Sequence, residues 1–272
     1  MGIISPCYAE HEFQWKKNNF SVIHLSTKTI DDVIDTLDIL VLINPNNPTG
    51  EIVDVNTIKT WQSKLNHKQD KGKGYLIIDE AFMDSTPENS MLGQYTADNL
   101  IVLRSVGKFF GLAGIRCGFV IAQPQILSLL EYHQGPWSVS GPTRWLVKKA
   151  LSDNDWIEQN KVHLKAASLR LEKLLKKYLI NNKQSHFLSG TVLYKTLYMD
   201  GASLIFEQLA MKGVLVRLLD KSCSCLSCTS QYKAIKGSHK GLRFGLPVDE
   251  RGWQRLEKVL ESIVGMTIKH RQ

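Results

Sequence analysis

One lysine of this sequence stands where an apolar run ends and a turn rich in small residues begins. The run at residues 100–103 predicts a buried strand, and Lys108 follows it closely. Ser105 before the lysine and Arg116 after it supply a hydroxyl and a fixed cation, which are groups that bind phosphate. A lysine amine condenses with aldehydes, so this spacing suits a cofactor that carries both a carbonyl and a phosphate.

Pyridoxal phosphate has this combination, and other residues suit its ring. It withdraws electrons only while its ring nitrogen is protonated, and a buried carboxylate favours that form. Asp79, directly after an apolar run, is the expected carboxylate. We expect Asn47 to donate to the ring oxygen, Ala81 to lie against one ring face and Tyr8 to stack on the other. Singly, each has an ordinary explanation in a turn, a cap or the core; together, at matched strand ends, they predict a cofactor site.

The segments that carry these residues alternate between apolar runs and amphipathic stretches. Strands are expected at residues 21–25, 38–43, 75–78, 100–103 and 118–122, and helices at 29–37, capped by Thr29, and at 56–65. This alternation predicts an α/β fold with a mainly parallel sheet sandwiched by helices. Such sheets bind ligands beyond the carboxyl ends of their strands, where Asn47, Asp79 and Lys108 all fall.

The alternation of apolar runs and amphipathic stretches changes after Pro136. Long helices are expected at residues 143–152 and 155–179, then strands at 191–198, 214–218 and 242–244 and helices at 202–211 and 250–264. We therefore expect a larger domain over residues 1–140 and a smaller α+β domain over residues 141–272.

Composition excludes several classes of protein. No run approaches the roughly 20 apolar residues of a membrane span, and the first residues lack a signal-peptide pattern, so we expect a cytoplasmic protein without a membrane partner. The formal charge of +8 comes from lysines spread over helix-like segments, which indicates a solvated surface and no nucleic-acid partner. Five cysteines, an odd number, argue for a reducing compartment.

Three motifs in combination resemble those of the fold-type I pyridoxal-phosphate enzymes of the aminotransferase class I/II group. They are residues 44–50 (NPNNPTG), residues 79–82 (DEAF) and residues 105–108 (SVGK) continuing to Arg116. The similarity runs over nearly the whole chain. It implies a transferase-like large domain, here incomplete, with pyridoxal 5'-phosphate as cofactor. It also implies a homodimer, because these enzymes form their sites at a dimer interface.

The resemblance also implies a role for each matching residue. The lysine matching Lys108 binds the cofactor covalently and is the catalytic residue, and the aspartate matching Asp79 pairs with the ring nitrogen. The asparagine matching Asn47 bonds the ring hydroxyl. The serine and arginine matching Ser105 and Arg116 hold the phosphate.

Within that group the sequence resembles the threonine-phosphate decarboxylases of cobalamin synthesis, which are close to histidinol-phosphate aminotransferases. The supporting segments are residues 79–84, 135–142, 213–217 and 242–245. The resemblance implies a small phosphorylated amino acid as substrate, with its phosphate on Arg217, its carboxylate on Arg243 and Asn47 beside it. It implies decarboxylation of L-threonine O-3-phosphate. The alternatives are an aminotransferase of the histidinol-phosphate type and a truncated, inactive member.

The sequence departs from the group's pattern at three places. Phe82 stands where aminotransferases of the group usually have a tyrosine that bonds the ring oxygen, which slightly favours decarboxylation. Gly107 replaces a serine or threonine that can contact the phosphate. Members also carry an N-terminal arm and a glycine-containing turn before the segment matching Tyr8, and these 272 residues contain neither. We therefore expect this chain alone to bind the cofactor weakly or not at all.

Penicillin-recognising acyl enzymes share part of the pattern. Residues 105–108 and 152–154 match two of their motifs, but Leu197 stands where the third requires glycine. Their nucleophilic serine opens a helix, whereas Ser105 is expected to end a strand, so this class is disfavoured.

A cysteine cluster is the other alternative. Cys223, Cys225 and Cys228 have spacings that suit thiolate ligands, but a structural zinc site needs four ligands and only His239 lies nearby. A reduced surface loop is favoured, and we expect no metal.

Overall fold

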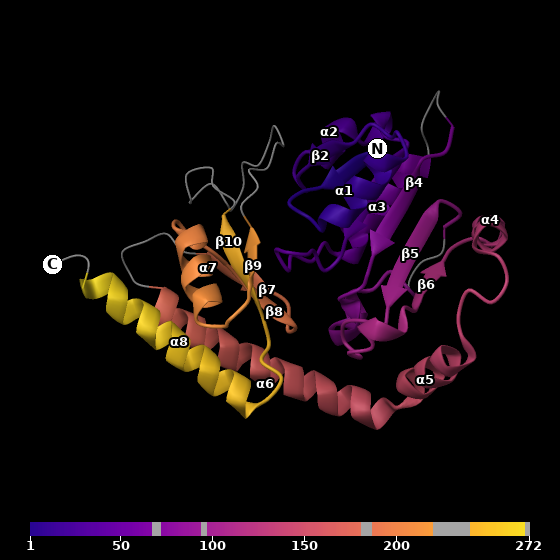
Figure 1. Ribbon diagram of the computed structural model, residues 1–272. Helices are drawn as coiled ribbons and strands as arrows, with labels where there is room; N and C mark the ends of the chain where they lie inside the picture. Colours follow the sequence, from indigo (N-terminus) through magenta and orange to yellow (C-terminus); the bar gives the residue numbers. More distant parts are fainter. Residues whose placement is uncertain (67–71, 94–96, 181–186, 220–239, 270–272) are drawn as a thin grey trace. The chain divides into compact units, whose positions relative to one another are not determined.

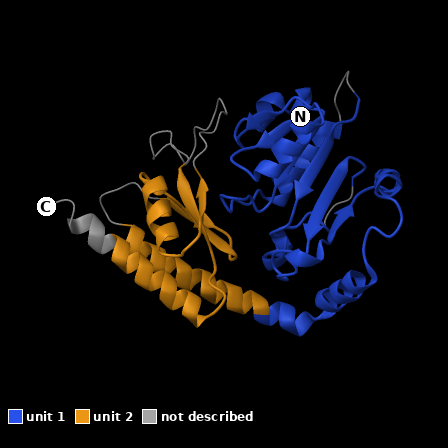
Figure 2. Ribbon diagram, in the orientation of Figure 1, with its two compact units in different colours: residues 1–159, 225–227 blue, residues 160–224, 228–272 orange. Residues whose placement is uncertain are grey.

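A computed structural model describes residues 1–66, 72–93, 97–180, 187–219 and 240–269. The described residues form two compact units, one within residues 1–159 and the other from residue 160 onward (Figures 1 and 2). The boundary lies inside helix α6 (Asn154–Leu179), later in the chain than the expected change at 140/141. Helix α5 (Gly141–Ser152) groups with the first unit, where its Thr143 hydroxyl donates to the Ile115 carbonyl at 3.4 Å. The assignment of functional domains to residues 1–140 and 141–272 stays a prediction.

The first unit is built on a six-stranded sheet in the order β2-β1-β3-β4-β5-β6. All neighbouring strands are parallel except β5 and β6, which are antiparallel. The strands are β1 (Gly2–Ile4), β2 (Ile23–Leu25), β3 (Ile39–Ile43), β4 (Tyr75–Asp79), β5 (Leu100–Ser105) and β6 (Gly118–Ile121). The expected α/β class with a mainly parallel sheet is confirmed.

The helices of this unit follow the expected positions only in part. They are α1 (Ala9–Lys17), α2 (Ile30–Val33), α3 (Val55–Asn66), α4 (Pro124–Gln134) and α5, with 3-10 turns η1 (Ile34–Thr36), η2 (Met83–Ser85), η3 (Pro87–Asn89) and η4 (Ala113–Ile115). The helix expected at 29–37 is divided between α2 and η1. Thr29 precedes α2, but its hydroxyl bonds the Ser26 carbonyl and does not cap the helix, so the expected cap is wrong.

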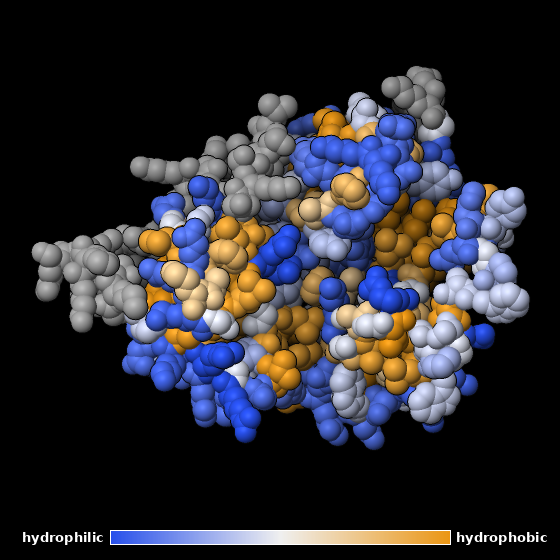
Figure 3. Space-filling view, viewed as in Figure 1, coloured by the Kyte–Doolittle hydropathy of each residue, from blue (hydrophilic) through white to orange (hydrophobic). Residues whose placement is uncertain are grey.

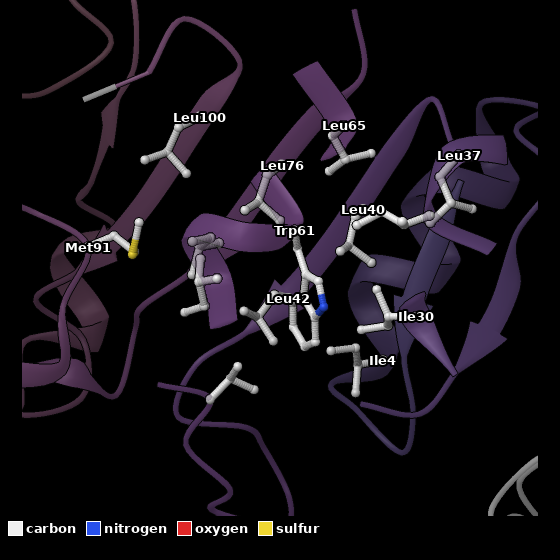
Figure 4. Packing of buried hydrophobic residues seen from close by; sticks show 14 of the residues in the cluster. Ile4, Ile30, Leu37, Leu40, Leu42, Trp61, Leu65, Leu76, Met91 and Leu100 are labelled. Atoms are coloured by element: carbon white, nitrogen blue, oxygen red, sulfur yellow. The ribbon is translucent and has the colours of Figure 1, made fainter. Parts of the chain in front are cut away.

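Helices cover both faces of the sheet because the central strands are apolar on both sides. Leu40 and Leu42 of β3 pack with Trp61 of α3 in one buried cluster (Figure 4). Val41 and Ile43, which alternate with them, belong to a second cluster on the opposite face that includes Trp15 of α1. A strand buried on both faces therefore reads as a continuous apolar run.

The second unit has a four-stranded antiparallel sheet in the order β7-β8-β10-β9. Its elements are α6, β7 (Phe187–Gly190), β8 (Tyr194–Tyr198), α7 (Ala202–Met211), β9 (Arg217–Leu219), β10 (Gly241–Gly245) and α8 (Glu250–Lys269). Leu242 and Phe244 of β10 join the core formed with these helices. Helices α6 and α8 lie side by side, joined by a bidentate Arg170–Glu250 pair with both distances 2.7 Å (Figure 1). The expected α+β pattern is confirmed.

No helix in the described ranges combines the length and apolarity needed to cross a membrane.

Candidate active site

The three predicted motifs leave the sheet at the same edge. Ile43 of β3 is in register with Asp79 of β4, and Asp79 is in register with Leu103 of β5. Because these strands are parallel neighbours, the segments that follow them emerge together beyond their carboxyl ends. The sheet thus places the turn 44–50, the carboxylate Asp79 and the lysine turn after β5 along one line.

Lys108 lies in the turn between β5 and β6. Two backbone hydrogen bonds close this turn, from Gly111 N to Lys108 O and from Leu112 N to Val106 O, both at 3.1 Å. Gly111 has a φ of 67°, a left-handed conformation that glycine adopts without a steric cost. The Lys108 side chain is exposed, and its Nζ lies 5.5 Å from the centre of the Phe82 ring. An ordered turn therefore presents an accessible amine.

Ser105 and Arg116 border the same turn. Ser105 ends β5, and its hydroxyl oxygen accepts a hydrogen bond from Gly107 N at 3.1 Å. Arg116 has a φ of 52°, a left-handed conformation that costs about 1 kcal/mol or more outside glycine, and its Nη1 donates to Ala113 O at 3.3 Å. Strain of this kind is concentrated at functional sites. A hydroxyl and a guanidinium in one turn supply donors that suit a phosphate.

Gly107 has a structural reason for departing from the usual serine or threonine. A Cβ built on Gly107 lies 3.2 Å from the Ala113 Cα and 3.3 Å from the Ser105 Oγ. Both distances are tighter than ordinary contacts of a Cβ, and the nearer atom belongs to the backbone, which cannot rotate away. The close approach of the turn to η4 therefore disfavours a side chain at this position, which would require the Ala113 backbone to shift by a few tenths of an ångström.

Asp79 is held by hydrogen bonds to both carboxylate oxygens. Its Oδ1 accepts from Ala81 N at 2.9 Å, and its Oδ2 accepts from His11 Nε2 at 2.8 Å. The Asp79 and His11 side chains are each only 17% exposed. The carboxylate is thus fixed in orientation and shielded from water, as a partner for a protonated ring nitrogen must be.

His11 is a site residue that the sequence reasoning missed. It lies in the first turn of α1, three residues after Tyr8, which directly precedes the helix in an extended conformation and accepts a hydrogen bond from His11 N at 3.3 Å. The ring of Tyr8, half-exposed, meets the His11 ring edge-on with centroids 6.2 Å apart. The spacing of Tyr8 and His11 was the available signal.

A second histidine anchors α1 to the sheet. Ser5 Oγ donates to His24 Nδ1 at 2.6 Å, and His24 Nε2 donates to Glu12 Oε1 at 3.1 Å. Although burial opposes ionisation of Glu12, hydrogen bonds from Lys16 and His24 hold its pKa below the usual value. The helix that presents His11 to Asp79 is therefore fixed against β1 and β2.

The turn that contains Asn47 is held by another asparagine. Asn44 N donates to Asp79 O at 2.9 Å, which ties this turn to the end of β4. The Asn44 side chain accepts from Val53 N at 2.9 Å and donates to Val53 O at 3.1 Å. Asn47 itself is buried in this braced turn at the carboxyl end of β3.

The two predicted substrate arginines are cross-strand partners in the second unit. Arg243 of β10 is in register with Arg217 of β9. Residues directly opposite in an antiparallel pair share a face and have Cβ atoms about 4.5–5.5 Å apart. Since Leu242 and Phe244 enter the core, Arg243 and Arg217 lie on the opposite face of the sheet. The Arg243 guanidinium lies 5.4 Å from the centre of the Tyr194 ring. Adjacent like charges repel, so this pair favours an anion between them.

The site residues of the first unit fit pyridoxal phosphate. Lys108 supplies an exposed amine, Asp79 a fixed carboxylate, and Ser105 and Arg116 donors for phosphate.

The two alternative site types find no support in the described part of the chain. Ser105 is the last residue of a strand, which contradicts the helix-opening serine of the acyl enzymes. No group of three or more histidine, cysteine or acidic side chains within the described ranges is placed to hold a metal ion. The cluster of Cys223, Cys225 and Cys228 lies outside the described residues.

Comparisons with known proteins identify the family of this chain. Residues 3–230 match the family model "Aminotransferase class I and II". The chain is 36% identical over 260 residues to the threonine-phosphate decarboxylase of Pseudomonas aeruginosa, covering 96% of this chain and 71% of that protein. It is 31% identical over 210 residues to the histidinol-phosphate aminotransferase of Buchnera aphidicola subsp. Schlechtendalia chinensis, covering 75% of this chain and 56% of that protein.

A solved structure of another protein has a similar fold. The crystal structure of the histidinol-phosphate aminotransferase from Clostridium acetobutylicum matches 97% of this chain and 77% of its own, with a TM-score of 0.80 and 22% identity. The expectations for fold, family and cofactor are confirmed. The chain belongs to the aminotransferase class I and II family of pyridoxal-phosphate-dependent enzymes.

Proposed function

We propose that this chain decarboxylates L-threonine O-3-phosphate, giving (R)-1-aminopropan-2-yl phosphate and carbon dioxide, in the synthesis of cobalamin. The proposal includes a cytoplasmic homodimer that binds no nucleic acid. The observation that carries it is the cross-strand pair of Arg217 and Arg243. The name of the Pseudomonas aeruginosa relative supports the same substrate.

The arginine pair favours a substrate with two anionic groups. Threonine phosphate has a phosphate and a carboxylate. Histidinol phosphate has a phosphate alone, although 2-oxoglutarate, the second substrate of an aminotransferase, has two carboxylates. Guanidinium groups bind both kinds of anion through paired hydrogen bonds. We assign the phosphate to Arg217 and the carboxylate to Arg243, with Asn47 also next to the substrate. A doubly anionic substrate offsets the mutual repulsion of the two arginines.

Each residue of the first unit has a defined task in this proposal. Pyridoxal phosphate, when bound, supplies an electron sink for the pair of electrons released at the α-carbon. Lys108 holds the cofactor and is the candidate that returns a proton to the α-carbon after the carboxylate leaves. Asp79 keeps the ring nitrogen protonated, and His11 orients Asp79. Ser105 and Arg116 retain the phosphate of the cofactor.

An aminotransferase of the histidinol-phosphate type is the second candidate. The identity to the Buchnera protein favours it, since both activities occur among the relatives. Phe82 weighs against it, because this buried ring has no hydroxyl to bond the cofactor's ring oxygen.

Product analysis tests the proposal. The protein, with excess pyridoxal phosphate, is incubated with O-phospho-L-threonine and, separately, with histidinol phosphate plus 2-oxoglutarate. Mass spectrometry is expected to find aminopropanol phosphate in the first reaction and no glutamate in the second. L-threonine is the matched control and should react at least about tenfold more slowly, because it lacks the phosphate that Arg217 binds. Glutamate formation without decarboxylation would make the chain an aminotransferase.

His11→Phe tests the positioning role of the second partner of Asp79. The variant keeps a ring of similar size but removes the donor that lies 2.8 Å from Asp79 Oδ2. A hydrogen bond to a charged group contributes about 1.5 kcal/mol or more, so we expect kcat to fall about tenfold with little change in KM. The pH dependence of the visible absorbance of the bound cofactor should also shift. His133→Phe, at an exposed position on α4, is the control. An unchanged pH profile in His11→Phe would show that Asp79 does not depend on His11.

A further inference from the structure

Three polar side chains form a hydrogen-bonded row between α1 and the sheet. Ser5 Oγ lies 2.6 Å from His24 Nδ1, and His24 Nε2 lies 3.1 Å from Glu12 Oε1. The proposed reaction uses none of these three residues. A hydroxyl, a base within hydrogen-bond reach of it and a third group that orients the base are the structural signature of an activated nucleophile. The row therefore has the parts that nucleophilic chemistry requires.

The fold brings the row together from three elements. Ile3 of β1 is in register with His24 of β2, and Ser5 follows Ile3 by two residues, so Ser5 and His24 share one face of the sheet. Trp15 of α1 packs with Ile3 on that face. Glu12 precedes Trp15 by three residues and therefore lies on the same side of the helix. Strand register and helical spacing thus fix the order of the three side chains.

Glu12 determines which nitrogen of His24 acts as the base. An ionised carboxylate only accepts hydrogen bonds, so Nε2 carries the ring proton and Nδ1 keeps its lone pair for the Ser5 hydroxyl. Burial raises the pKa of Glu12, but Lys16 and His24 together hold it below the usual value, so the carboxylate is charged at neutral pH. A charged Glu12 also stabilises the imidazolium that forms when Nδ1 takes the proton of Ser5.

The Ser5 hydroxyl is within reach of small molecules. Ser5 follows the last residue of β1 and is partly exposed, whereas Ile3 and Ile4 are buried. The side chains of His24 and Glu12 are 18% and 28% exposed. Most residues of α1 are polar, and Figure 3 shows mainly hydrophilic side chains over the part of the first unit that α1 occupies in Figure 1. These surroundings suit a small polar molecule better than a long apolar one.

We propose that Ser5 is an activated nucleophile that accepts an acyl group from a small activated acyl donor, such as an acyl phosphate or a nitrophenyl ester. Ser5 Oγ bonds to the carbonyl carbon, and the bond from that carbon to the leaving group breaks. The Ser5 proton passes to His24 Nδ1 and then to the leaving group or to water. The product is an ester on Ser5, and nothing is oxidised or reduced. A readily departing leaving group is needed, because the row supplies a base and no hydrogen-bond donor for the carbonyl oxygen.

Acylation of Ser5 has a structural consequence. An ester oxygen has no proton to donate, so the hydrogen bond to His24 Nδ1 is lost, and the link that runs through His24 from α1 to the end of β1 is broken. The same helix presents His11 to Asp79. Acylation therefore loosens the helix that borders the cofactor site. The effect on that site rests on the proposed function, whereas the reactivity of Ser5 does not.

Acetylation of the full chain with para-nitrophenyl acetate at neutral pH tests the proposal. Peptide mass spectrometry at early times is expected to find an acetyl group on Ser5. Ser63, on α3, is the internal control, since it is more exposed than Ser5. Activation by His24 should make the acetylation of Ser5 at least about tenfold faster than that of Ser63, although Ser63 is easier to reach.

Variants separate activation from exposure. His24→Gln keeps a side chain that donates and accepts hydrogen bonds but is no base, so acetylation of Ser5 should slow about 100-fold or more, within the usual contribution of general-base catalysis. Glu12→Gln should slow it less. His133→Gln, at an exposed position on α4, is the matched control and should react as the unchanged chain does. Thermal unfolding checks that each variant is folded. Amide hydrogen exchange of α1 should quicken after acetylation and stay unchanged in α3.

Three results would overturn the proposal. They are the absence of an acetyl group on Ser5, acetylation of Ser63 as fast as that of Ser5, and an unchanged rate at Ser5 in both His24→Gln and Glu12→Gln. Because the readout is a covalent label and not turnover, acetylation as expected in a chain that fails to decarboxylate would count against the proposed function alone.

Discussion

Lys108→Ala is expected to lower the rate of product formation by at least about 10³-fold. We assign this lysine to hold the cofactor and to donate the proton, and general acid–base catalysis alone contributes about 10²- to 10⁴-fold. The variant should also be unable to form a reducible covalent bond with pyridoxal phosphate. Borohydride reduction followed by peptide mass spectrometry measures that bond without reference to turnover. With pyridoxal phosphate in large excess, which loads even a weak site, the label in the unchanged chain should fall on the peptide that contains Lys108.

An exposed lysine elsewhere in the first unit provides the control. Lys148→Ala, on α5, should keep both the label and the activity. Labelling that persists in Lys108→Ala on another lysine would contradict the assignment of the turn after β5 as the cofactor site. Because the Lys108 turn is closed by backbone hydrogen bonds of Gly111 and Leu112, truncating the side chain should leave the fold intact.

Asp79→Asn is expected to reduce kcat by roughly 10²- to 10³-fold, the range found when a preorganised electrostatic partner is removed. Asparagine has nearly the same shape, and its oxygen can still accept from Ala81 N. It lacks the negative charge that we expect to keep the ring nitrogen of the cofactor protonated. The rate is measured by product formation, and the protonation change by the absorbance of the bound cofactor between pH 6 and 9, a range chosen around the ordinary histidine and amine pKa values.

A carboxylate far from the strand ends separates this effect from a general loss of charge. Asp98→Asn removes an exposed carboxylate that pairs with Lys73 at 3.3 Å and should leave rate and spectrum unchanged. If Asp79→Asn retained both the rate and the spectrum, another group would have to hold the ring nitrogen. Combining Asp79→Asn with His11→Phe should lower kcat no further than Asp79→Asn alone, because His11 acts only through the carboxylate of Asp79.

The central strands and their terminal residues were predictable from the sequence for a physical reason. Strands β3, β4 and β5 lie between other strands of the sheet, so they appear in the sequence as apolar runs. Polar residues begin where each of these runs ends. Asp79 and Lys108 therefore stood out. By contrast, α1 buries no residue fully, so it has no apolar stripe to recognise. The helix and its histidine were missed together.

Contacts between residues far apart in the sequence were the other feature that could not be predicted. That Arg217 and Arg243 oppose each other depends on the register of β9 against β10, and local sequence does not specify register. The bond of His11 to Asp79 likewise joins residues 68 positions apart. The position of α5 in the first unit depends on contacts such as that of Thr143 with Ile115, whereas the change in pattern near residue 140 reflects only composition.

The close packing of Gly107 against Ala113 limits the evolutionary routes open to this enzyme. The hydroxyl residue common at position 107 in its family is disfavoured here as a single substitution, because its Cβ would lie 3.2 Å from a backbone atom. It would first require η4 to move, and Arg116 directly follows η4. We therefore expect the effect of a substitution at position 107 to depend on where the η4 backbone lies.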